Sequence, residues 1–190
     1  MSNCNKDYCE IDFGAHPDDI ADDIKKISET GMMPKPIGRP TKDQYYIGIA
    51  LAVSKRSTCL KRHYGCVIVK NDEIIATGYN GNPRGTRNCC DRGFCTRLNV
   101  PHNTGDYSHC FSVHAEQNAM LSASRKDMIG ATMYLAGEEY KLDVNASAIA
   151  GEDIYSYIKV DEVEPCPICS RMIKNAGIAN VIGLADGRVD

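Results

Sequence analysis

The stretch Cys66-Val67-Ile68-Val69-Lys70-Asn71-Asp72-Glu73-Ile74-Ile75-Ala76-Thr77 predicts the centre of a β-sheet. Two apolar runs flank Asn71-Asp72, a residue pair that favours the tight turn of a hairpin. Because both runs are almost continuously apolar, we expect both strands to be buried on their two faces.

Helix and strand signals alternate on either side of this hairpin. Thr41-Lys42-Asp43-Gln44 fits a capping box, which predicts a helix that continues to Val53. Downstream we expect helices over 114–125 and 165–176, the second ending at Gly177. Strands are expected over 131–136, 155–160 and 178–184. Such alternation predicts an α/β sandwich around one sheet.

The chain of 190 residues is long enough for one compact domain. We expect residues 1–40 to be an N-terminal extension, with a short helix over 18–28 and a Pro-rich connector over 34–40. An alternative is an arm that packs on a neighbouring subunit. Residues 41–190 would form the domain.

Composition excludes several classes of protein. The net charge of -3 argues against a broad nucleic-acid-binding surface, although a small basic pocket for one phosphate stays open. No apolar run reaches the roughly 18 residues of a membrane span, and residues 1–12 do not resemble a secretory signal. We therefore expect a cytoplasmic protein without nucleic-acid or membrane partners.

Ten cysteines are the outlier of the composition. In a reducing cytoplasm, clustered cysteines indicate metal binding or catalysis more often than disulfides. His114, Cys166 and Cys169 would supply one imidazole and two thiolates, which leaves an open position on a catalytic zinc ion. Each would lie at the start of a helix, where the helix dipole lowers the pKa of a thiol.

Glu116 lies two residues after the histidine, near the metal without being needed as a ligand. Zinc lowers the pKa of a bound water to about 7, and a neighbouring carboxylate can move its proton to a leaving amine. Alone, the Cys-x-x-Cys pair would suggest a zinc knuckle or a redox pair, and His-x-Glu an ordinary helix surface. Together they form the known His-x-Glu…Pro-Cys-x-x-Cys signature of zinc nucleobase deaminases.

With these residues the chain resembles the deoxycytidylate (dCMP) deaminases of bacterial and phage type, within the cytidine deaminase superfamily. The resemblance covers about 41–184 and rests on Arg56-Ser57-Thr58-Cys59, Gly65-Cys66-Val67-Ile68-Val69, Gly78-Tyr79-Asn80-Gly81-x-Pro83-x-Gly85, His114-Ala115-Glu116-x-Asn118-Ala119, Pro165-Cys166-x-x-Cys169 and Asn175-Ala176-Gly177-Ile178. The segment 117–164 is longer than is usual in this family.

The resemblance implies a three-layer α/β/α sandwich with a central mixed sheet. It implies conversion of dCMP to dUMP for thymidylate synthesis, by a homo-oligomer, commonly a hexamer, that dCTP activates and dTTP inhibits. Rival activities are deamination of another nucleotide, a nucleoside, a base or tRNA adenosine. A non-enzymatic rival is a nucleotide-sensing zinc module, for which a retained general base such as Glu116 would serve no purpose.

For the substrate, the resemblance places Asn80 against the sugar hydroxyl and Ala115 at the pocket, whereas a simple turn asparagine is the alternative. We expect Arg56 to bind the phosphate, with Lys55 and Lys61 behind it, unless it is an ordinary surface charge. Arg84, Arg87 and Arg125 are candidates for an effector triphosphate, which Mg²⁺ could accompany.

The remaining cysteines and histidines suggest a second zinc ion. By resemblance to phage and bacterial relatives, Cys59 and Cys89 are its first ligands, with the others among His102, His109 and Cys110. The alternative is that these are reduced cysteines without a metal.

Overall fold

The computed structural model describes Asp22, Lys25 and Glu29, and residues 38–101, 104 and 107–183. Met1–Arg39 and Pro40–Asp190 form two separate compact units. Asp22, Lys25 and Glu29 are helical, and the rest of the helix expected over 18–28 lies outside the described residues. In the described part of the chain, no helix is long and apolar enough to cross a membrane.

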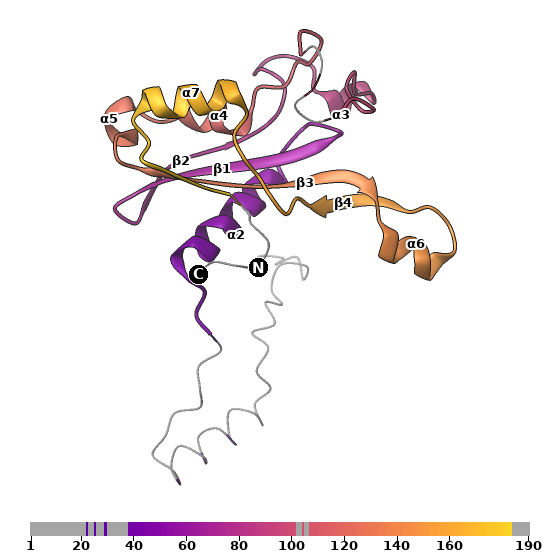
Figure 1. Ribbon diagram of the computed structural model, residues 1–190, viewed down its shortest axis with the longest axis horizontal. Coiled ribbons are helices and arrows are strands. Elements are labelled where there is room, and N and C mark those ends of the chain that lie inside the picture. The colour runs from indigo at the N-terminus through magenta and orange to yellow at the C-terminus, as the bar shows by residue number, and fades with distance from the viewer. Residues whose placement is uncertain are drawn as a thin grey trace, which may run out of the picture. The chain divides into compact units, whose positions relative to one another are not determined.

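The second unit is built on a five-stranded mixed sheet (Figure 1). β1 (Arg62–Lys70) pairs antiparallel with both β2 (Glu73–Tyr79) and β3 (Thr132–Leu142). The far edge of β3 is shared, because Thr132 to Leu135 pair parallel with β5 (Asn180–Gly183) and Glu138 to Leu142 pair antiparallel with β4 (Tyr155–Lys159). All five expected strands are present, and β3 extends six residues beyond the expected end at Ala136, to Leu142.

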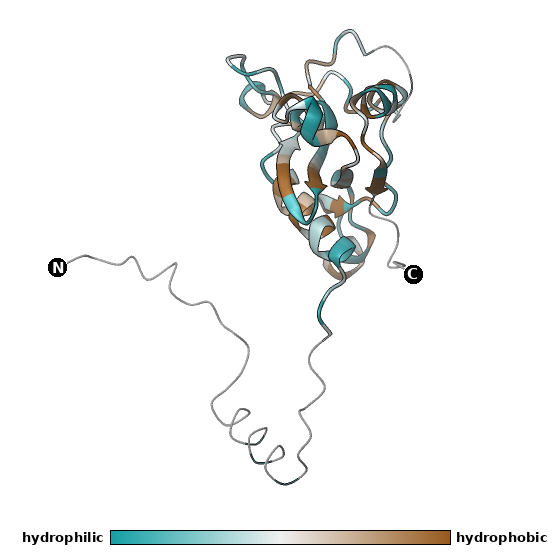
Figure 2. Ribbon diagram, turned by 90° about the vertical axis from the view of Figure 1, so that its left-hand side faces the viewer, coloured by the Kyte–Doolittle hydropathy of each residue, from teal (hydrophilic) through white to brown (hydrophobic). Residues whose placement is uncertain are grey.

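Helices cover both faces of this sheet, as the expected three-layer sandwich requires (Figure 1). α2 (Lys42–Ser54) packs Tyr46, Ile47 and Ala50 against Val67 and Tyr134 on one face. α4 (Ala115–Leu121), α5 (Arg125–Met128) and α7 (Pro167–Ala176) lie over the other face. Figure 2 shows hydrophobic stretches along the strands between these layers, and alternate residues of β1 belong to two buried clusters, one with Cys66 and Ile68 and the other with Val67 and Val69.

Two glycines allow the helices to come this close to the sheet. A Cβ at Gly65 would lie 1.9 Å from the carbonyl oxygen of Ala50 in α2. On the opposite face, a Cβ at Gly78 would lie 2.4 Å from the carbonyl oxygen of Ala115 and 2.3 Å from the backbone nitrogen of Ala119, both in α4. Gly78 therefore determines how near α4 lies to β2.

The hairpin is confirmed, with Asn71 at φ 52° and Asp72 at φ 66°, the left-handed backbone that a two-residue turn needs. The expectation that both strands are buried on two faces holds for β1 and is wrong for β2. β2 pairs only with β1 and is therefore an edge strand, so its side chains alternate between buried and exposed.

The helices differ from expectation in two places. The capping box of Thr41 and the end of α7 at Gly177, which has φ 85°, are confirmed. The helix expected over 114–125 ends at Leu121 instead, and α5 restarts after Ser124. The described residues of 86–112 are mostly irregular as expected, and the short helix α3 (Cys89–Arg92) is the one helix among them. α6 (Val144–Ala150), between β3 and β4, was not expected.

Candidate active site

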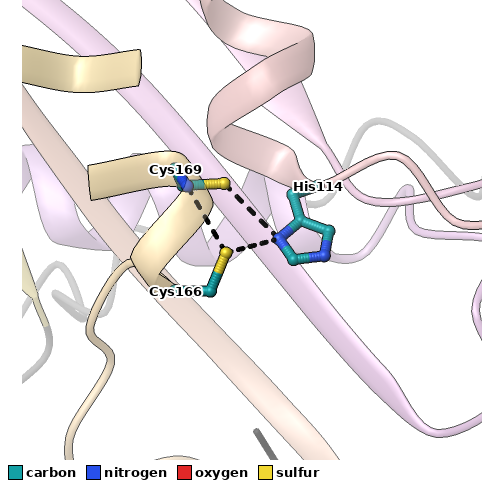
Figure 3. Close-up of side chains that lie close together, drawn as sticks. All are labelled: His114, Cys166 and Cys169. Atoms are coloured by element: carbon teal, nitrogen blue, oxygen red, sulfur yellow. Dashed lines mark hydrogen bonds between the residues drawn. The ribbon is translucent and has the colours of Figure 1, made fainter. Parts of the chain in front are cut away.

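Two helix starts bring the predicted metal ligands together (Figure 3). His114 is the N-cap of α4, and its backbone N–H donates to the Gln117 side chain at 3.0 Å. Cys166 is the N-cap of α7, and Pro167 follows at the first helical position, where a missing N–H costs nothing. Cys169 lies one turn into the same helix, and its backbone N–H points at the Cys166 sulfur, 3.4 Å away.

The spacing of the three side chains fits a metal ion. The Nδ1 atom of His114 lies 3.6 Å from the sulfur of Cys166 and 3.5 Å from that of Cys169. Zinc bonds of about 2.0–2.3 Å at tetrahedral angles separate a nitrogen and a sulfur ligand by about 3.6 Å. All three ligand atoms lie within 4.8 Å of one another, a spacing that no other group reaches in the described residues.

The surroundings of Cys169 disfavour its charged form while no cation is bound. Burial, followed by the neighbouring charge of Glu116, raises the pKa of the Cys169 thiol. The expectation that the helix dipole lowers the pKa of both thiols is therefore wrong for Cys169, because desolvation outweighs the dipole there. A bound divalent cation reverses this balance and favours the thiolate. The residues thus fit zinc, with two soft sulfur ligands and one imidazole.

Glu116 is placed as the sequence predicts. It lies in the first turn of α4, only 7% exposed, and its carboxylate makes a hydrogen bond with the Cys169 side chain. Because α4 holds both His114 and Glu116, its close approach to β2 at Gly78 fixes the ligand and the carboxylate together.

A pocket opens beside these residues. It is lined by Cys59, Lys61, Arg62, Tyr64, Asn80, Cys95, Arg97, Val100, Pro101, Tyr107, Cys110, Ser112, His114, Ala115, Glu116, Leu135, Val163, Glu164 and Cys166. His114, Cys166 and Glu116 therefore share one cavity with the predicted substrate residues Asn80 and Ala115.

Asn80 is held firmly in this pocket. Its Oδ1 accepts hydrogen bonds from the backbone N–H of Tyr64 at 2.8 Å and from the Ser57 hydroxyl at 2.7 Å. Its Nδ2 donates to the Arg62 carbonyl at 2.9 Å. The amide thus ties the loop after β2 to β1, and only its second N–H has no partner among the described residues.

The cations in the pocket are not the ones expected from the sequence. Arg56 is exposed and does not line the pocket. Lys55, expected to support it, pairs instead with the buried carboxylate of Glu138. Lys61, Arg62 and Arg97 line the pocket, of which only Lys61 was among the expected residues. Arg97 is 8% exposed and stacks on the Tyr107 ring at 3.8 Å, an arrangement that no local sequence signal indicates.

The three effector candidates lie outside the pocket. Arg84 is exposed, Arg87 donates to the Asp91 carbonyl at 2.7 Å, and Arg125 to the Asn175 carbonyl at 3.4 Å.

The cysteines expected to bind a second metal gather in part. Burial, and then the charges of Cys95 and Cys110, raise the pKa of Cys59. Burial, and then the charges of Cys59, Cys95 and Cys110, raise that of Cys89. Cys59 and Cys89 are therefore within electrostatic range of Cys95 and Cys110, although no three of these thiols lie within 4.8 Å of one another. Cys95 was not among the expected ligands. His109 is exposed, and His102 lies outside the described residues.

Comparisons with known proteins agree with this site. Residues 40–185 match the family model of the cytidine and deoxycytidylate deaminase zinc-binding region. The deoxycytidylate deaminase of Mycobacterium phage D29 is 36% identical over 154 residues, which are 77% of this chain and 96% of that protein. The deoxycytidylate deaminase of Saccharomyces cerevisiae is 33% identical over 173 residues, 90% of this chain and 46% of that protein. The chain spans less than half the length of the fungal relatives.

A solved structure of a deoxycytidylate deaminase is also similar to this chain. The dCMP deaminase of cyanophage S-TIM5, in complex with dCMP and dUMP, is 26% identical with a TM-score of 0.51, over 80% of this chain and 87% of that one. The family match covers the helices, the sheet and all the proposed zinc ligands. The chain therefore belongs to the cytidine and deoxycytidylate deaminase family.

Proposed function

We propose that this chain hydrolyses dCMP to dUMP and ammonia. The observation that carries the proposal is the group His114, Cys166 and Cys169 beside the buried carboxylate of Glu116, at one end of a pocket that also holds cations. The relatives support this substrate, since the phage D29 protein is a deoxycytidylate deaminase and the cyanophage enzyme binds dCMP and dUMP.

Zinc, when held by these three side chains, supplies a Lewis acid that makes water nucleophilic near neutral pH. The reaction forms a bond between the water oxygen and C4 of cytosine and breaks the bond between C4 and the amine. The two water protons end on ring N3 and on the leaving amine. Glu116 is the residue that moves them, because it is a buried carboxylate two residues after the ligand histidine, in the first turn of α4.

The cations that line the pocket would bind the substrate phosphate. Arg62 is already paired with Glu139, its Nε lying 2.8 Å from the carboxylate. Lys61 and Arg97 are joined, because the Lys61 ammonium donates to the Arg97 carbonyl at 3.0 Å. We therefore move the phosphate assignment from Arg56 to Lys61 and Arg97. The remaining N–H of Asn80 is available for the sugar hydroxyl, and Ala115 borders the base.

A substrate panel tests the proposal. Ammonia release is measured with dCMP, CMP, dCTP, deoxycytidine and guanine. We expect dCMP to have the highest kcat/KM, and deoxycytidine to be much poorer because its complex leaves the pocket cations without a phosphate. Equal kcat/KM for deoxycytidine and dCMP would reject the nucleotide assignment, and absence of turnover with all five compounds would reject the enzyme.

A pair of variants locates the phosphate. Lys61→Met should reduce the preference for dCMP over deoxycytidine by about tenfold or more, since a charge-assisted hydrogen bond contributes about 1.5–3 kcal/mol. Arg56→Met removes an equal charge outside the pocket and should leave the preference unchanged. A misfolded variant loses both activities together, so the ratio separates binding from folding. A lower ratio in the Arg56 variant alone would restore the assignment to Arg56.

The spare thiols support a second, structural zinc ion. Cys59 and Cys89 are within electrostatic range of Cys95 and Cys110, and soft thiolates favour zinc. No three of these thiols lie within 4.8 Å of one another, so a bound ion would have to draw them together. Residues 86–112 carry few large buried side chains, so a metal ion bound there would contribute directly to folding. In this proposed second zinc site, Cys95 takes the place of the expected ligands His102 and His109.

The remaining proposals concern regulation and assembly. In a homo-oligomer, a hexamer being the expected form, dCTP and dTTP would shift activity in opposite directions through Arg84, Arg87 and Arg125, with Mg²⁺ on the triphosphate. The dUMP formed would serve thymidylate synthesis. An effector acts only by binding two states of the enzyme with different affinities. Rates that neither triphosphate changes at any dCMP concentration would reject regulation.

A further inference from the structure

The segment between the end of β3 and the end of β4 forms an arm, which we define as residues 138–159. Its strands pair from Glu138↔Lys159 to Leu142↔Tyr155, and α6 connects them. In Figure 1, α6 lies at the far end of this hairpin, away from the helices that cover the sheet. None of the seven residues of α6 is buried.

Local hydrogen bonds hold α6 in place. The side chain of Asp143 caps its start, accepting from the backbone N–H of Ala146 at 2.9 Å and from the Ser156 hydroxyl at 2.9 Å. The Ser147 hydroxyl oxygen accepts a hydrogen bond from the backbone N–H of Ile154 at 2.9 Å. A single seven-residue helix is marginal in water without packing, and these hydrogen bonds support it at both ends.

The arm exposes large apolar side chains. Ile149 is 89% exposed and Val144 69% exposed, both on α6. Tyr140, Leu142 and Tyr155 are 42%, 37% and 53% exposed, and the strand register places all three on one face of the hairpin. Apolar side chains concentrated on one short projecting segment indicate a binding surface rather than scattered surface residues.

The charges of the arm identify the partner. α6 itself, Val144-Asn145-Ala146-Ser147-Ala148-Ile149-Ala150, carries no ionisable side chain. Exposed Lys141 precedes it, together with Asp143, whose carboxylate is engaged by the Ala146 N–H and the Ser156 hydroxyl, and exposed Glu152 and Asp153 follow it. Two copies of this helix, packed antiparallel about a twofold axis, would bring the acidic end of each beside the basic end of the other. A twofold interface requires this kind of self-complementary surface.

We propose that the arm is a self-association surface, on which the arm of a second copy of this chain docks with α6 against α6. The apolar side chains of Val144 and Ile149 form its centre, and Lys141 faces Glu152 and Asp153 of the partner subunit across its rim. The inference gives a location to the proposed homo-oligomer, and it does not depend on the reaction that the chain catalyses.

The full chain is tested by sedimentation velocity. Ile149→Lys should weaken the self-association that involves the arm by about tenfold or more, because each copy would bury a charge in place of an apolar side chain. Leu121→Lys is the matched control, since Leu121 is 78% exposed on α4, outside the arm. Circular dichroism and dCMP turnover monitor whether each variant folds.

Charge exchange provides a second test that does not alter the apolar centre. Lys141→Glu alone, and Glu152→Lys with Asp153→Lys, should each weaken association. Mixing these two proteins should restore association between them, because each rim then meets an opposite charge.

Three outcomes overturn the proposal. A monomeric wild-type chain at about 100 µM rejects both the arm and the oligomer. An oligomer that Ile149→Lys leaves intact, or that only Leu121→Lys dissociates, rejects the arm while the oligomer stands. Charge variants that weaken association but do not recover on mixing reject the antiparallel pairing.

Discussion

Gly78→Ala is the sharpest test of how the fold positions the catalytic carboxylate. The added Cβ would lie 2.4 Å from the Ala115 carbonyl oxygen and 2.3 Å from the Ala119 backbone nitrogen, whereas ordinary contact begins at 3.4 Å. Both neighbours are backbone atoms of α4, so no side chain can rotate away. The helix must retreat from β2 by about 1 Å, and it carries His114 and Glu116 with it.

This displacement should affect both stability and rate. Overpacking of this kind costs about 1–3 kcal/mol of unfolding free energy, and a misplacement of about 1 Å can cost about a hundredfold in rate. The measurements are the melting temperature, zinc content and kcat for dCMP. We expect lower stability and a much lower kcat in folded protein, with partial loss of zinc.

Two further Gly→Ala changes serve as controls. Gly48 lies on the exposed side of α2 with nothing within 4 Å of its Cβ position, so Gly48→Ala should stabilise the chain by about 0.5–1 kcal/mol. Gly65→Ala clashes with α2 on the opposite face, so it should lower stability without lowering kcat per folded molecule. Wild-type kcat and stability in Gly78→Ala would show that α4 does not depend on this contact.

Further outcomes follow from the site and the arm. Glu116→Gln should retain zinc and fold but lose about 10²–10⁴-fold in kcat for dCMP, and near-normal turnover would exclude Glu116 as the proton carrier. Cys166→Ala should lose the catalytic zinc, which elemental analysis measures, because two protein ligands hold zinc poorly. Wild-type chain should contain two zinc ions per subunit, and Cys89→Ser should lose one of them together with thermal stability; one ion in wild-type chain would refute the second site. Asp143→Ala removes the cap of α6 and should increase hydrogen exchange there, at a local cost of about 0.5–2 kcal/mol, with dCMP turnover unchanged.

That His114, Cys166 and Cys169 lie together could be predicted because the group is defined by local chemistry. His114 and Cys166 each precede a helix, and the ligand spacing follows from one helical turn. The hairpin was equally local, since Asn71-Asp72 adopts the backbone that its composition favours. In contrast, the exposure of β2 depends on its place at the sheet edge, which apolar content does not reveal.

Residues brought together by tertiary structure escaped prediction. Arg97 reaches the pocket because the irregular segment after α3 folds back over β1, where Lys61 holds the Arg97 carbonyl. Cys95 joins the spare thiols for the same reason. Arg56 follows the end of a helix, which made it a candidate, but its side chain is exposed and does not line the pocket. The helix expected over 114–125 breaks after Leu121. The sequence signals of this break are only Ser122 and Ser124, and serines are also common on helix surfaces.

Because the edge of β3 is divided between two strands, the pairing beside the proposed active site and the length of the arm are set independently. β5 pairs with Thr132 to Leu135, nearest the catalytic helices, whereas β4 pairs only from Glu138 onward. Residues inserted at the tip of the arm extend the β3–β4 hairpin, which points away from the β3–β5 pairing. The return path is fixed again by the Val160 backbone N–H, which donates to the Gly137 carbonyl at 3.0 Å before the chain reaches Cys166. Residues between Asp143 and Ile154 can therefore vary in number during evolution, or be exchanged for a foreign loop in the laboratory, without moving the chemistry.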